Sequence, residues 1–291
     1  MAAASPGTLF IVATPIGNLA DLTPRAAQTL ANVQLILCED TRHTAVLLRH
    51  LGIRPPLWSL HAHNEDKQIP AVVQRLRDGD HIALVSDAGT PCLSDPGAAL
   101  VAAVAKNAFP IQCLPGPFAA AVAIAASGLT AVPFAFWGFL PKKSAERQTV
   151  LRRCVQIAGQ QAAMTHAFYV PGRDLAEVVA DVQMLVPTGQ IVIARELTKL
   201  HEGYLRGTAS EVAALLTEDN LRGEAVLLIE LLADTQLNAQ TVLDPVALVR
   251  QARAQGLDRK KALQDIALQT HLSRRHLYAL WIAQDEGPSG S

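Results

Sequence analysis

Residues 12–23, VATPIGNLADLT, lie between the apolar run LFIV (residues 9–12) and PRAAQTLANV (residues 24–33), whose apolar residues have helical spacing. A strand, a glycine-containing turn and a helix in this order are typical of a nucleotide-phosphate loop. Neither G-x-G-x-x-G nor G-x-x-x-x-G-K-[ST] can be written here, however. The segment therefore predicts the first βα unit of an α/β fold and leaves open what the turn at Gly17 accommodates.

Outward from this unit, short β-rich runs alternate with amphipathic runs, which predicts a mostly parallel, wound sheet. The predicted strands are residues 8–13, 33–38, 56–60, 81–86 and 111–115, and the predicted helices between them are residues 24–33, 43–51, 69–79 and 97–107.

After residue 127 the alternation pauses, and a segment with two prolines, several aromatic residues and a basic cluster predicts a linker with an exposed loop. A second series follows, with strands at 166–170, 189–196 and 224–232 and helices near 173–185 and 208–218. The predicted organisation is an N-terminal α/β lobe (1–127), a linker (128–143), a C-terminal α/β lobe (144–233) and a helical tail (244–283).

The composition is that of a reduced, cytoplasmic, soluble enzyme. Half of the 291 residues are hydrophobic, and the formal net charge of −1 gives the whole molecule no affinity for polyanions, although a local basic patch is compatible with it. The four cysteines form no C-x-x-C pair, no histidine spacing suits zinc, and we expect no metal. The stretch MAAASPGTLFIVATP lacks the positive charges and the long apolar run typical of a signal sequence, and no 18 apolar residues run together, so we expect a soluble protein.

Two further turns follow predicted strands. Residues 83–100, ALVSDAGTPCLSDPGAAL, contain more Asp, Gly, Pro, Ser and Thr than a simple connection needs, and residues 114–128, LPGPFAAAVAIAASG, open a helix of small residues. Ligands bind beyond the carboxyl ends of parallel strands, so the three turns are expected to converge on one crevice, although residues 83–100 can also be a merely rigid connection.

Neither residues 12–23 nor residues 83–100 contain Lys or Arg, which argues against a phosphate ligand. Backbone N–H groups, hydroxyls and Asp87 suit a neutral or zwitterionic adenosine-bearing cofactor better, and S-adenosylmethionine fits that description.

Eight segments in register support this interpretation: VATPIGNLADLTPRA, CEDTRHTAVLLRHLGI, LHAHNE, LVSDAGTPCLSDPG, PGPFAAAVAIAASGL, FWGFLPKK, RELTKLHE and GEAVLLIE. Together they closely resemble the ribosomal RNA small-subunit methyltransferase I branch of the tetrapyrrole methylase superfamily. The resemblance implies a two-lobed fold, S-adenosylmethionine as methyl donor, a homodimer, and 2'-O-methylation of a cytidine ribose in the decoding centre of small-subunit RNA. It also implies that the turn at Gly17 faces the cleft between the lobes and leaves room for donor and acceptor.

With the resemblance, the strand-end segments indicate a cofactor site. Its expected members are Pro15, Ser86, Asp87, Ala88, Gly89, Pro91, Phe118, Ala119, Tyr169, Arg195, Leu197 and Ala225.

A ribose hydroxyl is a poor nucleophile, so a nearby base or a cation that stabilises the alkoxide is expected to help the reaction. Glu39 and Asp40 are candidate proton acceptors, Arg42 can hold phosphate or the alkoxide, and His61 and Glu65 can complete the acceptor pocket. Alternatively, Glu39 and Asp40 cap the following helix. His61, His63 and Glu65 are also compatible with a metal site on one strand face or with an ordinary polar surface.

Basic residues predict contacts with RNA phosphates: Lys142, Lys143 and Arg147 after the first lobe, and Arg259, Lys260, Lys261, Arg274 and Arg275 in the tail. A solvated helical face is the alternative for the tail, whose helix-turn-helix spacing is also compatible with a DNA-binding regulator. A tetrapyrrole or diphthine-type methyltransferase is the alternative for the whole chain.

One segment departs from the family. Relatives usually carry Glu-Ser/Ala-Pro-His-Arg after the strand that corresponds to AFYV, whereas this chain has Val170 in place of the Glu and Gly172 in place of the His, with Arg173 retained. The carboxylate and the imidazole are therefore absent from this side of the expected pocket.

Overall fold

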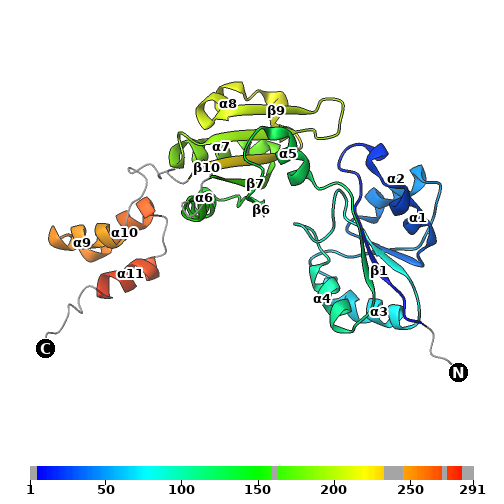
Figure 1. The fold of residues 1–291 in the computed structure, drawn as a ribbon. Helices are drawn as coiled ribbons and strands as arrows, with labels where there is room; N and C mark the ends of the chain where they lie inside the picture. Colours follow the sequence, from blue (N-terminus) through cyan, green and yellow to red (C-terminus); the bar gives the residue numbers. More distant parts are fainter. Residues whose placement is uncertain (1–4, 159–162, 233–244, 271–273, 284–291) are drawn as a thin grey trace.

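The computed structural model describes residues 5–158, 163–232, 245–270 and 274–283 (Figure 1). Within them the chain forms two α/β lobes, each on a five-stranded sheet, and a separate group of three helices. The two-lobed α/β fold with a helical tail that the sequence predicts is confirmed.

The first lobe has an entirely parallel sheet in the order β3-β2-β4-β1-β5. Its strands are β1 (Leu9–Val12), β2 (Leu35–Cys38), β3 (Leu57–Ser59), β4 (Ile82–Leu84) and β5 (Ile111–Leu114), and its helices are α1 (Pro24–Asn32), α2 (Thr41–His50), α3 (Glu65–Arg77) and α4 (Ala98–Lys106), with the short 3-10 helix η1 (Leu19–Asp21).

Helices cover both faces of this sheet, which is why its central strands are continuous apolar runs rather than alternating ones. On β1, Leu9 and Ile11 pack toward α3 and α4, whereas Val12 packs toward α1 and α2. The predicted wound parallel sheet is therefore present, and its strand ends point to one edge.

The second sheet has the order β6-β7-β10-β8-β9 and is antiparallel except for the β6–β7 pair. Its strands are β6 (Phe134–Phe139), β7 (Ala163–Pro171), β8 (Gln190–Arg195), β9 (Gly203–Thr208) and β10 (Glu224–Leu232), and its helices are α5 (Ala119–Ser127), α6 (Ser144–Ala158), α7 (Leu175–Leu185) and α8 (Ala209–Leu215), with the 3-10 helices η2 (Gly172–Asp174) and η3 (Glu218–Leu221).

Two parts of the predicted boundary need correction. Residues 128–143 are not only a linker, because β6 lies within them and pairs with β7 as an edge strand. Helix α5, assigned from sequence to the first lobe, packs on the second sheet, where Ala120, Ala123 and Ile124 contact β8 and β10. Helices α6, α7 and α8 cover the opposite face of this sheet.

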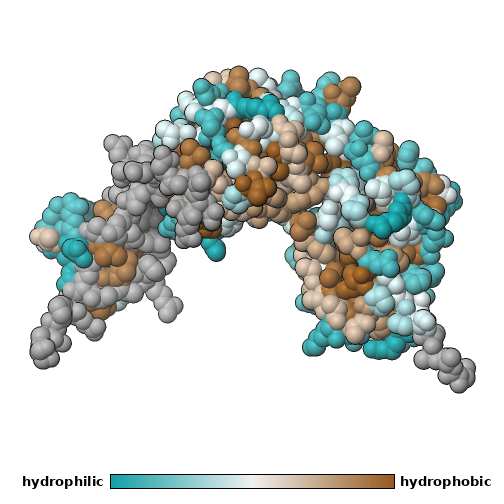
Figure 2. All heavy atoms as spheres, viewed as in Figure 1, coloured by the Kyte–Doolittle hydropathy of each residue, from teal (hydrophilic) through white to brown (hydrophobic). Residues whose placement is uncertain are grey.

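The tail comprises α9 (Pro245–Ala254), α10 (Arg259–Thr270) and α11 (Arg274–Ala283). These helices share a small core of their own, which includes Val249, Leu263, Leu277 and Trp281. Figure 2 shows apolar side chains of the tail among hydrophilic ones, and further apolar side chains along the inner side of the two lobes. Among the described residues, no helix is both long and apolar enough to cross a membrane.

Candidate functional site

A cavity of about 590 Å³ lies where the two lobes meet. On the first-lobe side it is lined by residues that follow β1, β2 and β4: Ile16, Glu39, Asp87, Ala88, Gly89, Thr90, Leu93, Ser94, Asp95 and Pro96. On the second-lobe side it is lined by Ala119, Phe139, Tyr169, Ala194, Glu196, Leu197, Lys199, Gly223, Glu224, Ala225 and Val226. The cavity therefore lies at the carboxyl ends of the parallel strands, where a ligand of such a sheet is expected.

Hydrogen bonds hold the three predicted turns together at this cavity. The backbones of Thr14 and Gly89 exchange two hydrogen bonds of 2.9 and 3.0 Å. The Thr90 hydroxyl donates to the carbonyl oxygen of Pro117 over 2.9 Å. The predicted convergence of residues 12–23, 83–100 and 114–128 on one crevice is therefore confirmed.

At Gly17 the turn after β1 lies close against residues 197–199 of the second lobe. A Cβ atom added to Gly17 would lie 2.7 Å from the carbonyl oxygen of Leu197 and 2.8 Å from Oγ1 of Thr198. A side chain at this position would thus force the lobes apart. The space beside Gly17 is filled by protein, which corrects the expectation that it is left for donor and acceptor, whereas the preceding residue, Ile16, lines the cavity.

The wall of the cavity is acidic. Its lining carboxylates are Glu39, Asp87, Asp95, Glu196 and Glu224. Lys199, which pairs with Glu196, is its one basic lining residue in the described part of the chain. Burial, and then the charge of Glu39, raise the pKa of Asp95 to about 6. Burial, and then the charge of Asp87, also raise the pKa of Glu39. Carboxylates that repel one another in this way favour a ligand with positive charge.

Seven of the residues predicted to bind cofactor line the cavity, namely Asp87, Ala88, Gly89, Ala119, Tyr169, Leu197 and Ala225. The structure does not place the other five in its wall. Each of these, Pro15, Ser86, Pro91, Phe118 and Arg195, directly adjoins a lining residue in the sequence. Phe118 instead packs its ring on Phe136, with 5.0 Å between the ring centroids.

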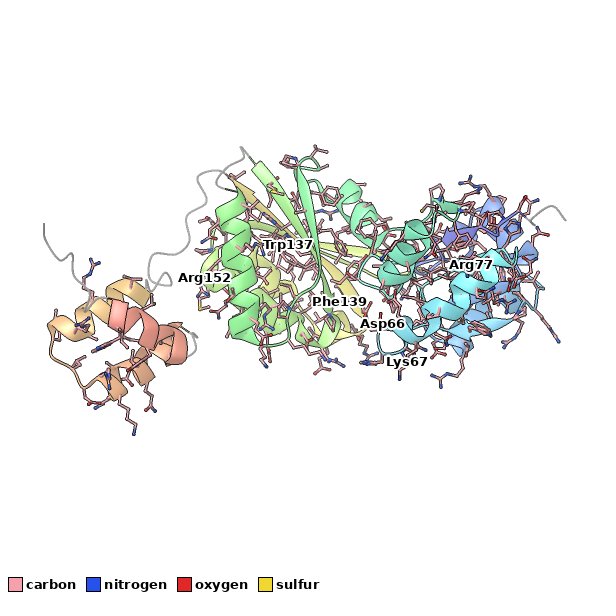
Figure 3. The ribbon with its side chains drawn as sticks, turned by 90° about the horizontal axis from the view of Figure 1, so that it is seen from below. Asp66, Lys67, Arg77, Trp137, Phe139 and Arg152 are labelled. Carbon is pink, nitrogen blue, oxygen red and sulfur yellow. The ribbon has the colours of Figure 1, made fainter. Side chains whose placement is uncertain are left out.

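Sequence reasoning missed four charged lining residues: Asp95, Glu196, Lys199 and Glu224. Asp95 lies in the same turn-rich segment as Asp87, so the signal for it was present. Glu196 and Lys199 lie in RELTKLHE, which was expected at the cleft without a role for each side chain. Phe139 at the end of β6 was missed because β6 itself was not predicted, and Figure 3 shows it near the junction of the lobes.

Of the predicted catalytic residues, Glu39 is the one that lines the cavity. Asp40 is the N-cap of α2, where its Oδ1 accepts a hydrogen bond of 2.8 Å from the backbone N–H of Arg42. The Arg42 side chain, 89% exposed, forms a 2.6 Å ion pair with Asp40. These hydrogen bonds from Arg42 hold the pKa of Asp40 well below its usual range. The helix-cap interpretation therefore fits Asp40 and does not fit Glu39.

His61 and Glu65 stabilise the start of α3 and α4. The backbone N–H of His61 donates to Oδ1 of Asn64 over 2.8 Å, so residues 61–64 form a turn rather than the strand face that the sequence suggested. Oε1 of Glu65 accepts a 2.8 Å hydrogen bond from the backbone N–H of Leu100. Neither side chain lines the cavity. In the described part of the chain, no three His, Cys, Asp or Glu side chains are grouped to hold a metal ion.

The departure from the family at Val170 lies on the far side of β7. Val170 is fully buried in the core beneath α6 and α7, whereas its neighbour Tyr169 points to the cavity. A Cβ atom on Gly172 would lie 2.7 Å from the carbonyl oxygen of Arg222, so the backbone here leaves no room for a histidine. Neither change alters the lining of the cavity.

The predicted RNA-binding residues differ in exposure. Lys142, Lys143, Arg259, Lys260 and Lys261 are exposed. The prediction for Arg147 is wrong, because its side chain is 2% exposed and its Nε lies 2.6 Å from Oδ2 of Asp181. The side chains of Arg274 and Arg275 lie outside the described residues.

Comparison with known proteins yields one family. The profile of the tetrapyrrole (corrin/porphyrin) methylases matches residues 8–213. The ribosomal RNA small subunit methyltransferase I of Synechocystis sp. is 40% identical over 274 residues, which cover 94% of this chain and 97% of that protein. The protein of the same name from Xylella fastidiosa is 43% identical over 233 residues, 79% of this chain and 84% of its own.

Solved structures share the fold. Diphthine synthase superposes with a TM-score of 0.60 at 12% identity and covers 77% of this chain and 90% of its own. Uroporphyrin-III C-methyl transferase from Thermus thermophilus, complexed with S-adenosyl homocysteine, gives a TM-score of 0.52 at 16% identity and covers 77% of this chain and 97% of its own.

Proposed function

This chain belongs to the tetrapyrrole methylase family, and from that premise we propose that it methylates the 2'-hydroxyl of a cytidine ribose in the decoding centre of small-subunit ribosomal RNA. The chain is an S-adenosylmethionine-dependent methyltransferase. The observation that carries the choice of RNA as substrate is its identity of 40%, along nearly its whole length, to a ribosomal RNA small subunit methyltransferase I.

The cavity suits the methyl donor in size and charge. Its volume of about 590 Å³ falls in the range of pockets for ligands of this size, roughly 300–1,000 Å³. S-adenosylmethionine supplies a methyl group on a cationic sulfonium. We assign its binding to the turn at residues 86–91, to Ala119, Leu197 and Ala225, and to the carboxylates of Asp87 and Asp95. Tyr169, which also lines the cavity, is included in this assignment, whereas Pro15, Phe118 and Arg195 directly adjoin lining residues.

On the acceptor side we propose Glu39 as the group that accepts the hydroxyl proton, because its carboxylate lines the same cavity and burial raises its pKa. Asp40 orients Arg42 at the start of α2, and the exposed guanidinium of Arg42 binds a phosphate next to the methylated nucleotide. His61 and Glu65 act indirectly: the backbone N–H of His61 holds the turn that follows β3, and the Glu65 carboxylate ties the start of α3 to the start of α4.

The proposed substrate sets the remaining expectations. The protein acts as a homodimer in the cytoplasm, where ribosomes are assembled, and binds either free ribosomal RNA or the small subunit. Exposed lysines at residues 142–143 and 260–261 provide local positive charge on a chain with a net charge of −1.

The test is to map ribose methylation in small-subunit RNA from cells with the intact protein, without it, and with Glu39→Gln. We expect one methylated cytidine to be lost in the second and third cases. The Glu39→Gln protein should still bind S-adenosylmethionine in calorimetry. Unchanged RNA methylation, together with transfer of the methyl group to a porphyrinoid or to a diphthine-type protein substrate in vitro, would replace this proposal with the alternative of the same fold.

A further inference from the structure

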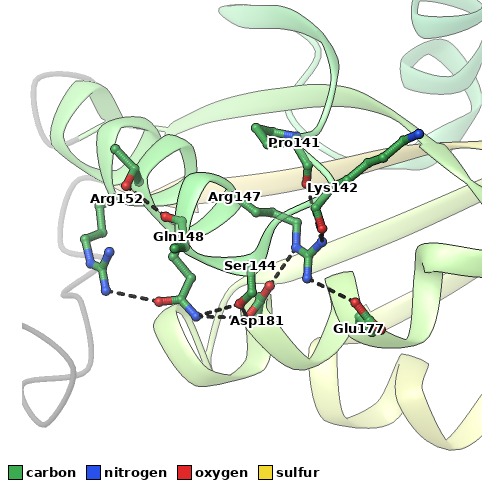
Figure 4. Close-up of polar contacts among 10 residues, drawn as sticks. Pro141, Lys142, Ser144, Arg147, Gln148, Arg152, Glu177 and Asp181 are labelled. Atoms are coloured by element: carbon green, nitrogen blue, oxygen red, sulfur yellow. Dashed lines mark hydrogen bonds and ion pairs between the residues drawn. The ribbon is translucent and has the colours of Figure 1, made fainter. Parts of the chain in front are cut away.

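The side chain of Arg147 is buried inside the second lobe, and each of its three guanidinium nitrogens has a polar partner. It lies on α6, and its Nε pairs with Oδ2 of Asp181 on α7 over 2.6 Å (Figure 4). Oδ1 of Asp181 also accepts hydrogen bonds from the Ser144 hydroxyl, over 2.8 Å, and from Nε2 of Gln148, over 3.0 Å. A buried charge is costly unless it is well paired, and the several partners of Asp181 and Arg147 limit that cost here.

The remaining contacts of Arg147 reach the turn that carries two exposed lysines. Its Nη1 donates to the carbonyl oxygen of Lys142 over 2.9 Å and to that of Pro141 over 3.4 Å, as Figure 4 shows. Its Nη2 lies 3.7 Å from Oε2 of Glu177. The planar guanidinium can serve Asp181 and this turn together, whereas a lysine ammonium at the same position cannot.

The same turn continues directly from the wall of the cavity. Phe139 lines the cavity, and the backbone N–H of Leu140 donates to the carbonyl oxygen of Tyr169 over 3.1 Å. Two residues later the chain reaches Lys142 and Lys143, which are exposed. Lys143 is 3.2 Å from Oε1 of Glu146, but both side chains are largely exposed, so this pair is weak and can open for another anion.

We propose that Arg147 is a positioning residue for the nucleic-acid substrate. From inside the lobe it fixes the backbone of residues 141–143, so that Lys142 and Lys143 present their charges beside the methyl-donor cavity for contact with RNA phosphates. The inference rests on the proposed RNA-methylating function. Its physical basis is preorganisation: a turn that is already fixed loses little conformational entropy when the RNA binds.

The experiment is a double-mutant cycle on the full-length protein. One arm is the pair Arg147→Met and Asp181→Asn, which removes both buried charges and leaves an acceptor for Ser144 and Gln148. The other arm is Lys142→Ala with Lys143→Ala, and the fourth protein combines the two arms. Binding to small ribosomal subunits from cells that lack the protein is measured across a salt series, and S-adenosylmethionine affinity is measured by calorimetry.

We expect the lysine variant to lose roughly tenfold or more in subunit affinity and more than one unit of log–log salt slope, as loss of two phosphate contacts requires. The Arg147 and Asp181 variant should show a large part of both losses with S-adenosylmethionine affinity within about twofold of the original. It should cause no further loss in the lysine-free protein, because coupled residues are not additive.

A matched control is Leu185→Ala, which opens a hole in the same core at an apolar residue that takes no part in the hydrogen bonds to the turn, and which should leave the salt slope unchanged. If the paired variant fails to fold, Arg147→Lys is measured in its place. Full subunit affinity in the Arg147 variant, or an equal loss with and without the lysines, would overturn the positioning role. Absence of methyl transfer to subunits by the unaltered protein would instead refute the proposed function itself.

Discussion

At the scale of single residues, the carboxyl group of Asp95 lowers the stability of the folded protein when it is ionised, while its negative charge suits a cationic ligand. Its pKa of about 6 in the folded protein exceeds that of an ordinary aspartate, chiefly because of burial and then because of Glu39. The folded state therefore holds this proton more tightly than the unfolded state, and ionisation of Asp95 costs stability as the pH rises from about 4 to 6.

We predict that Asp95→Asn raises the free energy of unfolding of the ligand-free protein by about 1 kcal/mol at pH 7.5, after allowance for solvent in the cavity. The same change should weaken S-adenosylmethionine binding, because it removes one of the two carboxylates to which we assign the binding of this cation. Urea unfolding at pH 7.5 and pH 4.5 measures the first effect, which should shrink at the lower pH. An equal gain from Asp66→Asn, an exposed site on α3, would mean that the effect is not specific to the cavity.

His166 supplies a second prediction at this scale, unrelated to the cavity. It is fully buried on β7, its Nδ1 accepts a 2.9 Å hydrogen bond from Nε1 of Trp137, and burial lowers its pKa to about 4. An unfolded chain takes up this proton near pH 6.5, so unfolding is favoured as the pH falls from 6.5 toward 4. We expect a loss of about 2 kcal/mol between pH 7 and pH 4.5 from this group.

The measurement is the free energy of unfolding against pH for the unaltered protein and for His166→Gln, which does not titrate but keeps an acceptor for Trp137. The variant should be less stable at pH 7 and should show a flatter decline below pH 6.5. His201→Gln, at an exposed position, should leave the slope as it is. If the His166 variant declines as steeply as the unaltered protein, buried His166 is not the source of the acid sensitivity.

At the scale of elements, the turn after β1 and the segment after β8 meet at Gly17. An added methyl group at Gly17 would lie 2.7 Å from the Leu197 carbonyl oxygen, closer than such atoms approach. Since Ile16 and Leu197 both line the cavity, separation of these segments would widen it. We predict that Gly17→Ala weakens S-adenosylmethionine binding roughly tenfold and lowers stability by about 1–3 kcal/mol, the usual cost of overpacking.

Calorimetric binding and thermal unfolding check this prediction, with Gly203→Ala as the matched control. At Gly203 the nearest atom to an added Cβ is 3.9 Å away, an ordinary contact. The Gly203 variant should bind the donor as the unaltered protein does. Normal donor affinity in the Gly17 variant would show that the lobes can shift there without cost to the site.

The elements that the sequence predicted correctly are those with strong local patterns. The buried strands of the first lobe have continuous apolar runs, and each is followed by an amphipathic helix. The edge strands β6 and β9 were missed because half-exposed, aromatic or glycine-containing runs such as FAFWGF and GYLRGT do not show that pattern. Helix α6 was missed because its buried face includes Arg147 and Gln148, whose polarity predicts exposure.

The residues of the site were likewise predictable only in part from the sequence. The three turns at strand ends and seven cofactor-site positions follow from the sequence with the resemblance, because parallel strands end at a common edge. The sequence does not predict whether the side chain of a turn residue points into the cavity or toward the adjoining helix. Asp40 and Glu39 are neighbours, yet one caps a helix and the other lines the cavity.

At the scale of the whole molecule, the cavity belongs to neither lobe alone. Asp87 and Asp95 come from the first lobe, whereas Tyr169 and Glu224 come from the second. The tail is different, because its buried residues pack within α9, α10 and α11. Its ordered core includes a hydrogen bond of 2.9 Å from Nη1 of Arg253 to the carbonyl oxygen of Trp281. Removal of the tail should therefore leave the cores of the two lobes intact.

The tail is also where local positive charge is concentrated. Residues 250–276 contain seven Lys or Arg and two Asp, an excess of five in a chain whose net charge is −1. Arg259, Lys260 and Lys261 lie exposed at the start of α10. Cations near the N-terminus of a helix oppose its dipole, so Lys260 and Lys261 do not stabilise α10 in this way and are available to a polyanion, whereas Arg259 also lies over the ring of Tyr278, 5.3 Å from its centroid.

We predict that a chain ending at residue 235 binds S-adenosylmethionine with unchanged affinity but binds small-subunit RNA more weakly. Each lost phosphate contact should lower the log–log salt slope by about one unit. A full-length chain with Arg259, Lys260 and Lys261 all changed to Gln tests whether the charge of the tail, rather than its presence, matters. It should reproduce most of the loss of RNA affinity while the tail stays folded. If the truncated, the neutralised and the unaltered proteins share one RNA affinity across the salt series, the tail is a solvated helical unit. RNA contact would then fall to the lobes, where the exposed Lys142 and Lys143 follow Phe139 of the cavity wall by three and four residues.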